Sequence, residues 1–155
     1  MKTAVAVVVL SVAVAGMSAQ AIPDLSGRWV ADAAKSDPAP AGAGRGRGNP
    51  NEMVIARADD TITVTLGGAN YIYNLDGSER TGPPGGETKS KMAWDDGTLV
   101  VTWKREFFAG PDKGYVTSTG RDTYTRSANV LTVERTTALP GEPAQTRKTV
   151  YNKAS

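Results

Sequence analysis

The chain has 155 residues, with 18 basic and 16 acidic side chains, a net charge of +2, and neither histidine nor cysteine. Its length suits one domain, and so small a net charge does not indicate a protein that binds nucleic acid or another polyanion. The missing residue types exclude Ser-His-Asp and Cys-His catalysis, zinc and blue-copper sites and any disulfide, so we expect no enzyme, no metal and no cofactor.

Residues 1–21 have the pattern of a secretory signal peptide. Lys2 precedes a run of small and β-branched residues over 4–15, and Ala19-Gln20-Ala21 follows as a small-x-small cleavage motif. We therefore expect cleavage after Ala21 and a periplasmic or secreted protein with no membrane span after cleavage. No cysteine follows the small residues, so a bacterial lipoprotein anchor is excluded.

From Ile22 onward the apolar residues follow a period of two, which is typical of β-strands, and no stretch keeps helical spacing. Short turns such as Asp76-Gly77 and Asp96-Gly97 separate the segments and favour antiparallel pairing of neighbouring strands. The predicted strands are Gly27–Ala33, Glu52–Ala58, Thr61–Leu66, Tyr71–Leu75, Glu87–Trp94, Thr98–Phe107, Tyr115–Arg126, Val130–Thr137 and Gln145–Asn152. Their even spacing predicts one all-β domain over 22–155, an antiparallel up-and-down β-barrel of eight or nine strands.

The alternation also predicts which side chains point into the barrel. On the strand over 98–107, the more apolar alternate set consists of Leu99, Val101, Trp103 and Arg105, so we expect this set to face inward. By the same comparison, Arg135 points inward with the apolar residues of its strand. Tyr124 points inward together with Asp122.

Four of these inward side chains form a candidate ligand site: Trp103, Arg105, Tyr124 and Arg135. The rings of Trp29 and Trp103 either floor a cavity or fill the core of a small barrel. Two inward arginines with one acid between them leave a spare positive charge that favours an anionic head group. Alternatively, each arginine reaches the barrel rim and keeps its head in water. The acidic residues stand mostly in turns, so neither a glycosidase carboxylate pair nor a calcium loop is expected.

Residues 38–50 read PAPAGAGRGRGNP and contain nothing to bury, so we expect a mobile loop. The segment Gly44-Arg45-Gly46-Arg47-Gly48 superficially resembles an RNA-binding tract or a phosphate loop. A phosphate loop, however, requires a strand before it and a helix after it. A solvated loop is the simpler interpretation, and a contact with an anionic envelope surface or a partner protein is the alternative.

The segment Asp24-Leu25-Ser26-Gly27-Arg28-Trp29 resembles the G-x-W opening of lipocalins and other calycin barrels. In that family the tryptophan lies across the barrel bottom under a basic side chain from the last strand. The resemblance therefore implies a structural plug of Gly27 and Trp29, with Arg147 or Lys148 as the basic partner. Residues 93–101, 122–125 and 131–135 are similar to small exported bacterial proteins described as lipocalin-like. This resemblance implies a barrel with an apolar ligand, and it supplies no catalytic residues.

Two functions are consistent with the sequence. The first is an exported, monomeric, non-enzymatic protein that holds a small apolar or amphipathic ligand inside the barrel. The alternative is an exported inhibitor or envelope accessory protein that binds a protein partner through its outer surface or the 38–50 loop. A cavity inside the barrel favours the first function, whereas a filled barrel favours the second.

Overall fold

The structure of the protein is a computed structural model that describes residues 22–38, 51–82 and 88–155. All regular secondary structure in these three segments is β. A search of the same segments for a helix with the length and apolarity needed to cross a membrane finds none. The expected signal peptide, and all but the first residue of the expected mobile loop, lie outside the described residues.

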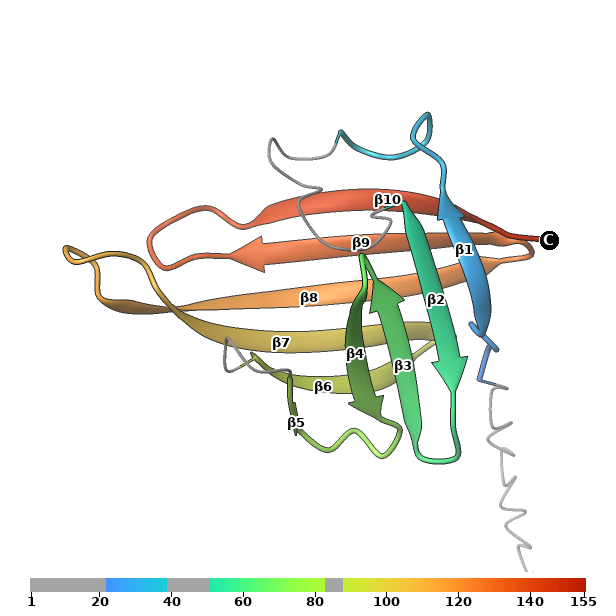
Figure 1. Cartoon of the computed structure of the whole chain (residues 1–155), viewed down its shortest axis with the longest axis horizontal. Helices are drawn as coiled ribbons and strands as arrows, with labels where there is room; N and C mark the ends of the chain where they lie inside the picture. The colour runs from blue at the N-terminus through green and yellow to red at the C-terminus, as the bar shows by residue number, and fades with distance from the viewer. Residues whose placement is uncertain (1–21, 39–50, 83–87) are drawn as a thin grey trace, which may run out of the picture.

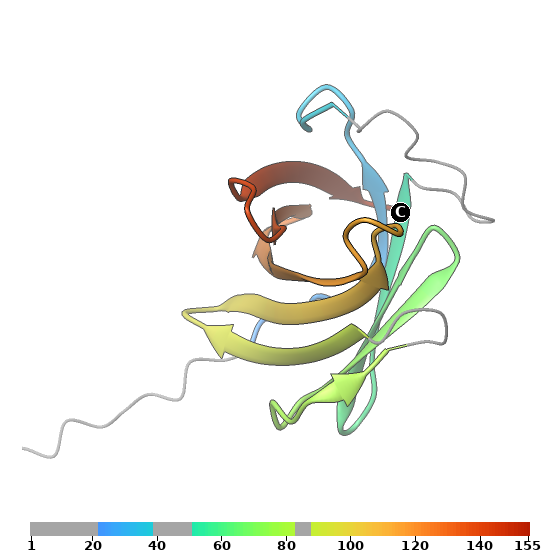
Figure 2. The same cartoon turned by 90° about the vertical axis from the view of Figure 1, so that its left-hand side faces the viewer.

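Ten strands form one antiparallel sheet that curls into a barrel (Figure 1). They are β1 (Gly27–Ala31), β2 (Glu52–Arg57), β3 (Thr61–Leu66), β4 (Ala69–Asn74), β5 (Arg80–Thr81), β6 (Thr88–Asp95), β7 (Thr98–Phe108), β8 (Tyr115–Ser127), β9 (Val130–Ala138) and β10 (Gln145–Lys153). Figure 1 shows β1–β4 crossing in front of β6–β10 at a steep angle, and Figure 2 shows these two layers facing each other. The core lies between the two layers.

The predicted fold class, an antiparallel up-and-down barrel of the lipocalin kind, is confirmed, with ten strands instead of eight or nine. All nine predicted strands are present. The additional strand, β5, has only two residues, which is too short for an alternating pattern to appear in the sequence. The first strand is shorter than predicted, because a turn begins at Asp32, whose carbonyl accepts a hydrogen bond from the Lys35 backbone at 3.2 Å.

The strands follow an up-and-down order that is interrupted at one place. Successive strands are hydrogen-bonded neighbours, and β1 pairs with β10, but β4 and β5 are the two edges of the sheet. β4 approaches both β5 and β6 without pairing with either. The barrel is therefore nearly closed, and it has one seam without hydrogen bonds between β4 and β5.

One apolar core lies inside the barrel, and its members follow the predicted alternation. On β3, the buried Ile62 and Val64 alternate with partly exposed threonines. The fully buried side chains, in order of residue volume, are Trp29, Tyr124, Met53, Leu99, Leu131, Val64, Val101 and Asp122. Asp122 is the one charged group in this set, and it marks the place where the core meets a polar site.

Trp29, the expected plug residue, is buried between the first and last strands. Its side chain is completely buried, and its Nε1 donates a hydrogen bond to the carbonyl oxygen of Leu25 at 3.0 Å. Two cations lie over its ring: Lys153 Nζ is 5.6 Å from the centroid, and the guanidinium carbon of Arg126 is 5.9 Å from it. Gly27 has φ +132°, a backbone conformation that favours glycine, and a Cβ there would stand 3.0 Å from Lys153 Cε.

The implied basic partner of Trp29, Arg147 or Lys148, is wrong. Strand register explains the difference, because the residue of β10 that pairs with Trp29 is Lys153. Arg147 pairs instead with Arg135 on β9. It therefore lies six residues before Lys153 on β10, about 20 Å from Trp29 at the usual rise per residue.

Candidate ligand-binding pocket

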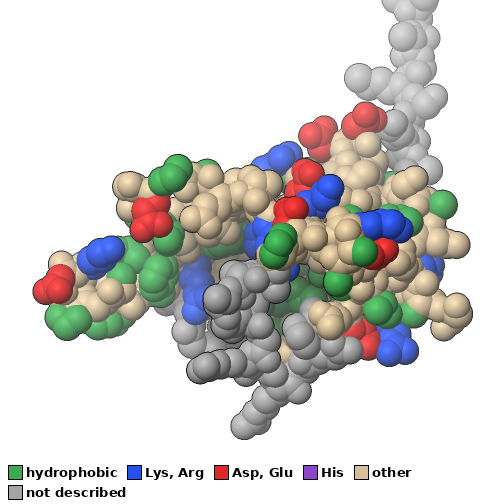
Figure 3. Space-filling model, turned by 90° about the horizontal axis from the view of Figure 1, so that it is seen from above, with side chains coloured by type: hydrophobic (Ala, Val, Ile, Leu, Met, Phe, Trp, Pro, Cys, Tyr) green, Lys and Arg blue, Asp and Glu red, His purple; other side chains and the backbone are tan. Residues whose placement is uncertain are grey.

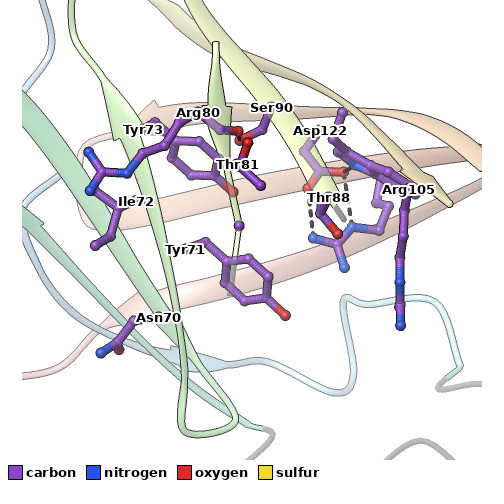
Figure 4. A pocket seen from close by; sticks show the side chains of 13 residues that line it. Asn70, Tyr71, Ile72, Tyr73, Arg80, Thr81, Thr88, Ser90, Arg105 and Asp122 are labelled. Carbon is purple, nitrogen blue, oxygen red and sulfur yellow. Dashed lines mark hydrogen bonds and ion pairs between the residues drawn. The ribbon is translucent and has the colours of Figure 1, made fainter. Parts of the chain in front are cut away.

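A pocket of about 650 Å³ opens into the barrel beside the seam between β4 and β5 (Figure 4). Six strands, β4 to β9, contribute to its wall. The lining residues are Asn70, Tyr71, Ile72, Tyr73, Arg80, Thr81, Gly82, Thr88, Ser90, Trp103, Arg105, Asp122 and Arg135. In Figure 4, Tyr71 and Tyr73 reach from β4 toward the side where Asp122 and Arg105 lie. The two unpaired edge strands thus both contribute to the pocket wall.

An ion pair between a buried carboxylate and a partly exposed arginine lines this pocket. Asp122 is 1% exposed and accepts two hydrogen bonds from Arg135, from Nε to Oδ1 at 2.9 Å and from Nη2 to Oδ2 at 2.6 Å. Trp103 Nε1 donates a third bond to Oδ1 at 3.2 Å. Asp122 and Arg135 are direct cross-strand neighbours on β8 and β9. The strand register therefore dictates this pair once the alternation turns both residues inward.

The charge of Arg135 remains accessible from the pocket. Burial lowers the pKa of this side chain, but the hydrogen bonds and the charge of Asp122 outweigh that effect and raise the pKa above its ordinary value. The arginine side chain is 46% exposed, whereas the carboxylate beneath it is 1% exposed. Arg135 is thus a permanent cation held in one orientation, with part of its surface open to a ligand.

Two tyrosines add neutral hydroxyl groups near the ion pair. Burial, reinforced by the negative charge of Asp122, raises the pKa of Tyr73 and of Tyr124 well above the ordinary value. A side-chain hydrogen bond with Tyr124 acts on the pKa of Tyr73 in the opposite direction, and burial outweighs it. Both hydroxyls therefore keep their protons at physiological pH, and Tyr73 presents a donor to the pocket that it lines.

Two further arginines line the pocket at its edge. Arg105 is exposed at the mouth, and within residues 22–38, 51–82 and 88–155 its side chain has no hydrogen-bonding or ionic partner. Arg80 donates a hydrogen bond to Asn74 Oδ1 at 3.0 Å, and its guanidinium points away from Arg105 in Figure 4. Among the described lining residues, only Asp122 is acidic. The pocket therefore has more positive than negative charge.

A fourth arginine stands next to this site. Arg147 on β10 is the direct cross-strand partner of Arg135, and its Nε is buried without a hydrogen-bond partner. Like charges placed directly opposite each other on a sheet are destabilising. The inner face of the barrel thus holds two neighbouring guanidinium groups, of which only Arg135 is neutralised by a carboxylate.

The structure brings three of the four predicted ligand residues together in the pocket: Trp103, Arg105 and Arg135. Tyr124 is not among the lining residues, because it is 2% exposed and packs in the apolar core. The sequence left two placements open for these arginines, an inward paired position and a position at the barrel rim, and each arginine adopts a different one. Arg135 points inward and is paired, whereas Arg105 reaches the rim and is exposed.

Sequence reasoning missed the contribution of β4 and β5. Tyr71 and Tyr73 stand at alternate positions of one predicted strand, which was a signal that both rings share a face. Nothing in the sequence marked β4 as a sheet edge, so the position of the seam was not predictable.

No cluster of three or more acidic side chains that would suit a metal ion occurs in the part of the chain that the structure describes.

The fold and the pocket together define a lipocalin-like β-barrel with an arginine-rich pocket at a seam of the sheet. No protein-family model matches the chain, and no curated protein matches it. It is similar to the crystal structure of a secretary abundant heat soluble (SAHS) protein from Ramazzottius varieornatus, with a TM-score of 0.58 and 16% sequence identity. The match covers 84% of this chain and 95% of that chain. At this level of identity the likeness concerns the fold alone.

Proposed function

We propose that the protein is an exported, non-enzymatic binding protein that holds a small amphipathic molecule with an anionic head group. The observation that carries this proposal is the charge of the pocket. Arg105 and Arg135 reach the pocket from β7 and β9, and Asp122 is the one carboxylate among its described lining residues. Because Asp122 is already bonded to Arg135, the unpaired Arg105 supplies the attraction for an anion.

The remaining walls suit the apolar part of such a molecule. Tyr71, Tyr73 and Trp103 present ring surfaces, and Ile72 adds an aliphatic side chain. The volume of about 650 Å³ lies within the range of about 300–1,000 Å³ that is usual for small-molecule sites. Apolar walls with a few convergent polar groups bind the tail by burial and fix the head by hydrogen bonds.

The alternative function, a filled barrel that binds a protein partner, has less support. A pocket of this size does not suit a filled barrel. The 38–50 loop that this alternative uses lies, apart from Pro38, outside the described residues. The binding function therefore rests on observed geometry, and the loop-mediated function rests on sequence alone.

The test compares dodecanoate, dodecanol and dodecylamine, which share an alkyl chain and differ in the charge of the head group. We expect dodecanoate to bind most tightly, because its head group is anionic. Trp103 lines the pocket, so binding should change the tryptophan fluorescence. Arg105→Gln should weaken dodecanoate binding about tenfold and leave dodecanol binding unchanged. Arg57→Gln, an exposed arginine at the end of β2, is the matched control. Equal binding of all three compounds, or binding of none, would contradict the proposal.

A further inference from the structure

The β7–β8 hairpin projects beyond the barrel (Figure 1). Two exposed aromatic residues stand near its end, Phe108 and Tyr115. Phe108 and Tyr115 are direct cross-strand partners, with ring centroids 5.5 Å apart and an interplanar angle of 60°. They are 58% and 72% exposed, more than any other exposed large hydrophobic residue that the structure describes. Figure 3 shows hydrophobic side chains gathered at this projecting end.

The turn between the two rings is well defined. The Ala109 backbone donates a hydrogen bond to the Gly114 carbonyl at 2.8 Å, and the Gly114 backbone donates one to Gly110 at 2.8 Å. Both glycines have positive φ, which lets the chain reverse within these few residues. The rings are thus held in water by a hydrogen-bonded turn, where polar residues would serve the fold equally well. Their apolar surface is therefore available to a partner.

Basic side chains lie behind the rings on the same face of the sheet. Along β7 and β8, strand alternation places Lys104 on the outer face with Phe108, and Arg121 on that face with Tyr115. Lys89 on β6 is the direct partner of Lys104, so two like charges face each other. The basic cluster consists of Lys89, Lys91, Lys104 and Arg121. Glu106 and Glu134 lie on the same face, and Glu79 Oε2 is 4.0 Å from Lys104 Nζ. The turn between the two rings carries one acid and one base, Asp112 and Lys113.

We propose that this hairpin docks the protein on an anionic lipid surface. The rings of Phe108 and Tyr115 enter the interfacial region, where burial of the Phe108 ring is favourable and Tyr115 keeps its hydroxyl in contact with water. The basic cluster behind them contacts anionic head groups, and each such contact strengthens binding about fivefold at low salt. An anionic surface also relieves the repulsion between Lys89 and Lys104. A lipid interface therefore satisfies both features of this face, its apolar end and its positive charge.

The docked orientation also places the pocket near the lipid. Arg105, at the mouth of the pocket, precedes Phe108 by three residues on the same strand, a separation of about 10 Å. An amphipathic molecule that leaves the bilayer therefore has a short path to the arginine at the mouth. Lipid docking does not require that the pocket bind such a molecule, so the two proposals are tested separately.

The test is sedimentation of the protein with vesicles of phosphatidylcholine alone and of phosphatidylcholine mixed with phosphatidylglycerol. We expect binding to the mixed vesicles at low salt and weaker binding as salt is added. The double variant Phe108→Ser with Tyr115→Ser should lower the affinity about tenfold or more. Its matched control is Val30→Ser with Val54→Ser, which removes apolar side chains that are 40% and 37% exposed on β1 and β2.

A second pair of variants tests the basic cluster. Lys89→Gln with Lys104→Gln should lower the affinity for the mixed vesicles about tenfold or more, because two contacts with head groups are lost. Arg57→Gln with Lys148→Gln removes the same charge from the other strands and should leave the affinity unchanged. Circular dichroism and thermal unfolding should match those of the parent protein, since all of these side chains are exposed or partly exposed.

Insertion of the ring is observed directly with Phe108→Trp. We expect its fluorescence to shift to the blue when mixed vesicles are added, whereas Val54→Trp should show no shift. Absence of sedimentation at low salt, or equal sedimentation of the Phe108/Tyr115 double variant, would overturn the proposal. So would a dimer that this double variant dissociates without any vesicle binding, because the rings would then join two copies of the chain. Dodecanoate binding by the double variant should stay unchanged, which separates this result from the pocket test.

Discussion

The indole of Trp103 lies against the backbone of Gly120, its direct partner on the neighbouring strand β8. A Cβ added to Gly120 would stand 2.1 Å from Cζ2 and 2.2 Å from Cε2 of the indole. The missing side chain lets the ring cross β8, and Trp103 Nε1 then reaches Asp122 at 3.2 Å. One glycine thus sets the position of the aromatic wall and of one donor to the buried carboxylate.

Gly120→Ala should therefore displace the indole. We expect a loss of about 1–3 kcal/mol in the free energy of unfolding, as for other overpacked sites, together with a shift in tryptophan emission. In a Trp103→Leu background the smaller side chain leaves room for the methyl group, so the same change should cost much less. The measurement is a double-mutant cycle by denaturant unfolding. Additive effects of the two changes would show that the ring does not depend on this glycine.

Asp122→Asn should lower stability and strengthen anion binding. The amide retains the shape of the carboxylate but leaves Arg135 without a counter-charge, and loss of a hydrogen bond to a charged group costs about 1.5–3 kcal/mol. Part of that loss is regained from water, because the arginine side chain is 46% exposed. The freed charge should raise the affinity for dodecanoate severalfold. Thermal unfolding and fluorescence titration give the two readouts, and unchanged affinity would mean that Arg135 does not contact the head group.

Trp29→Ala should cost about 3–5 kcal/mol, typical of removing a buried tryptophan, which is a large share of the stability of a domain. Trp29 is completely buried and hydrogen-bonded, whereas Trp94 is only partly buried at the margin of the core, and its buried Nε1 has no partner. Trp94→Ala should therefore cost much less. Denaturant midpoints provide the comparison, and equal small effects at both positions would show that Trp29 is not the closing plug.

Removal of Lys153 and removal of Arg147, the observed and the expected cation at Trp29, should affect stability differently. Lys153→Met removes a charge above the Trp29 ring and should lower stability by about 0.5–2 kcal/mol. Arg147→Met removes a buried nitrogen without a partner and a like charge opposite Arg135, so it should leave stability unchanged or raise it. Melting temperatures of the two variants decide between them. A larger loss with Arg147→Met would restore the arrangement that the family resemblance implied.

The sequence was sufficient for features that depend on alternation within a strand. The inward direction of Trp103, Arg135 and Asp122 follows from their apolar neighbours two residues away, and the turns define which strands pair. Features that depend on register between distant strands were not predictable. Lys153, and not Arg147, meets Trp29 because of the offset between the first and last strands, and no local pattern encodes that offset.

The position of the seam between β4 and β5 was also not predictable from the sequence. The sequence predicts a strand around Tyr71 and Tyr73, but the missing pairing between β4 and β5 depends on how the whole sheet closes. The pocket therefore contains predicted residues from β7 and β9 and unpredicted ones from the edge strands. The cavity lies where two edge strands remain unpaired. The alternation within each strand does not specify which strands become edges.

Alkaline pH should unfold the protein through its buried tyrosines. Burial raises the pKa of Tyr73, Tyr124 and Tyr151 above the ordinary value of 10.0. Their contribution to stability is fully present below about pH 10, where folded and unfolded chains are both protonated, and is lost as pH rises toward the folded-state pKa values. Each such tyrosine lowers the free energy of unfolding by about 1.4 kcal/mol per pH unit in that range.

Tyr124→Phe tests this mechanism, because Tyr124 is the most deeply buried of the three. The variant loses a hydroxyl that bonds Tyr73, so it should be less stable at neutral pH by about 0.5–1.5 kcal/mol. Above about pH 10 its stability should fall less steeply than that of the parent, since one proton fewer is released on unfolding. Denaturant unfolding across this range gives both slopes, and the slopes near neutral pH should be identical. Parallel curves above about pH 10 would show that Tyr124 ionises equally in the folded and unfolded chains.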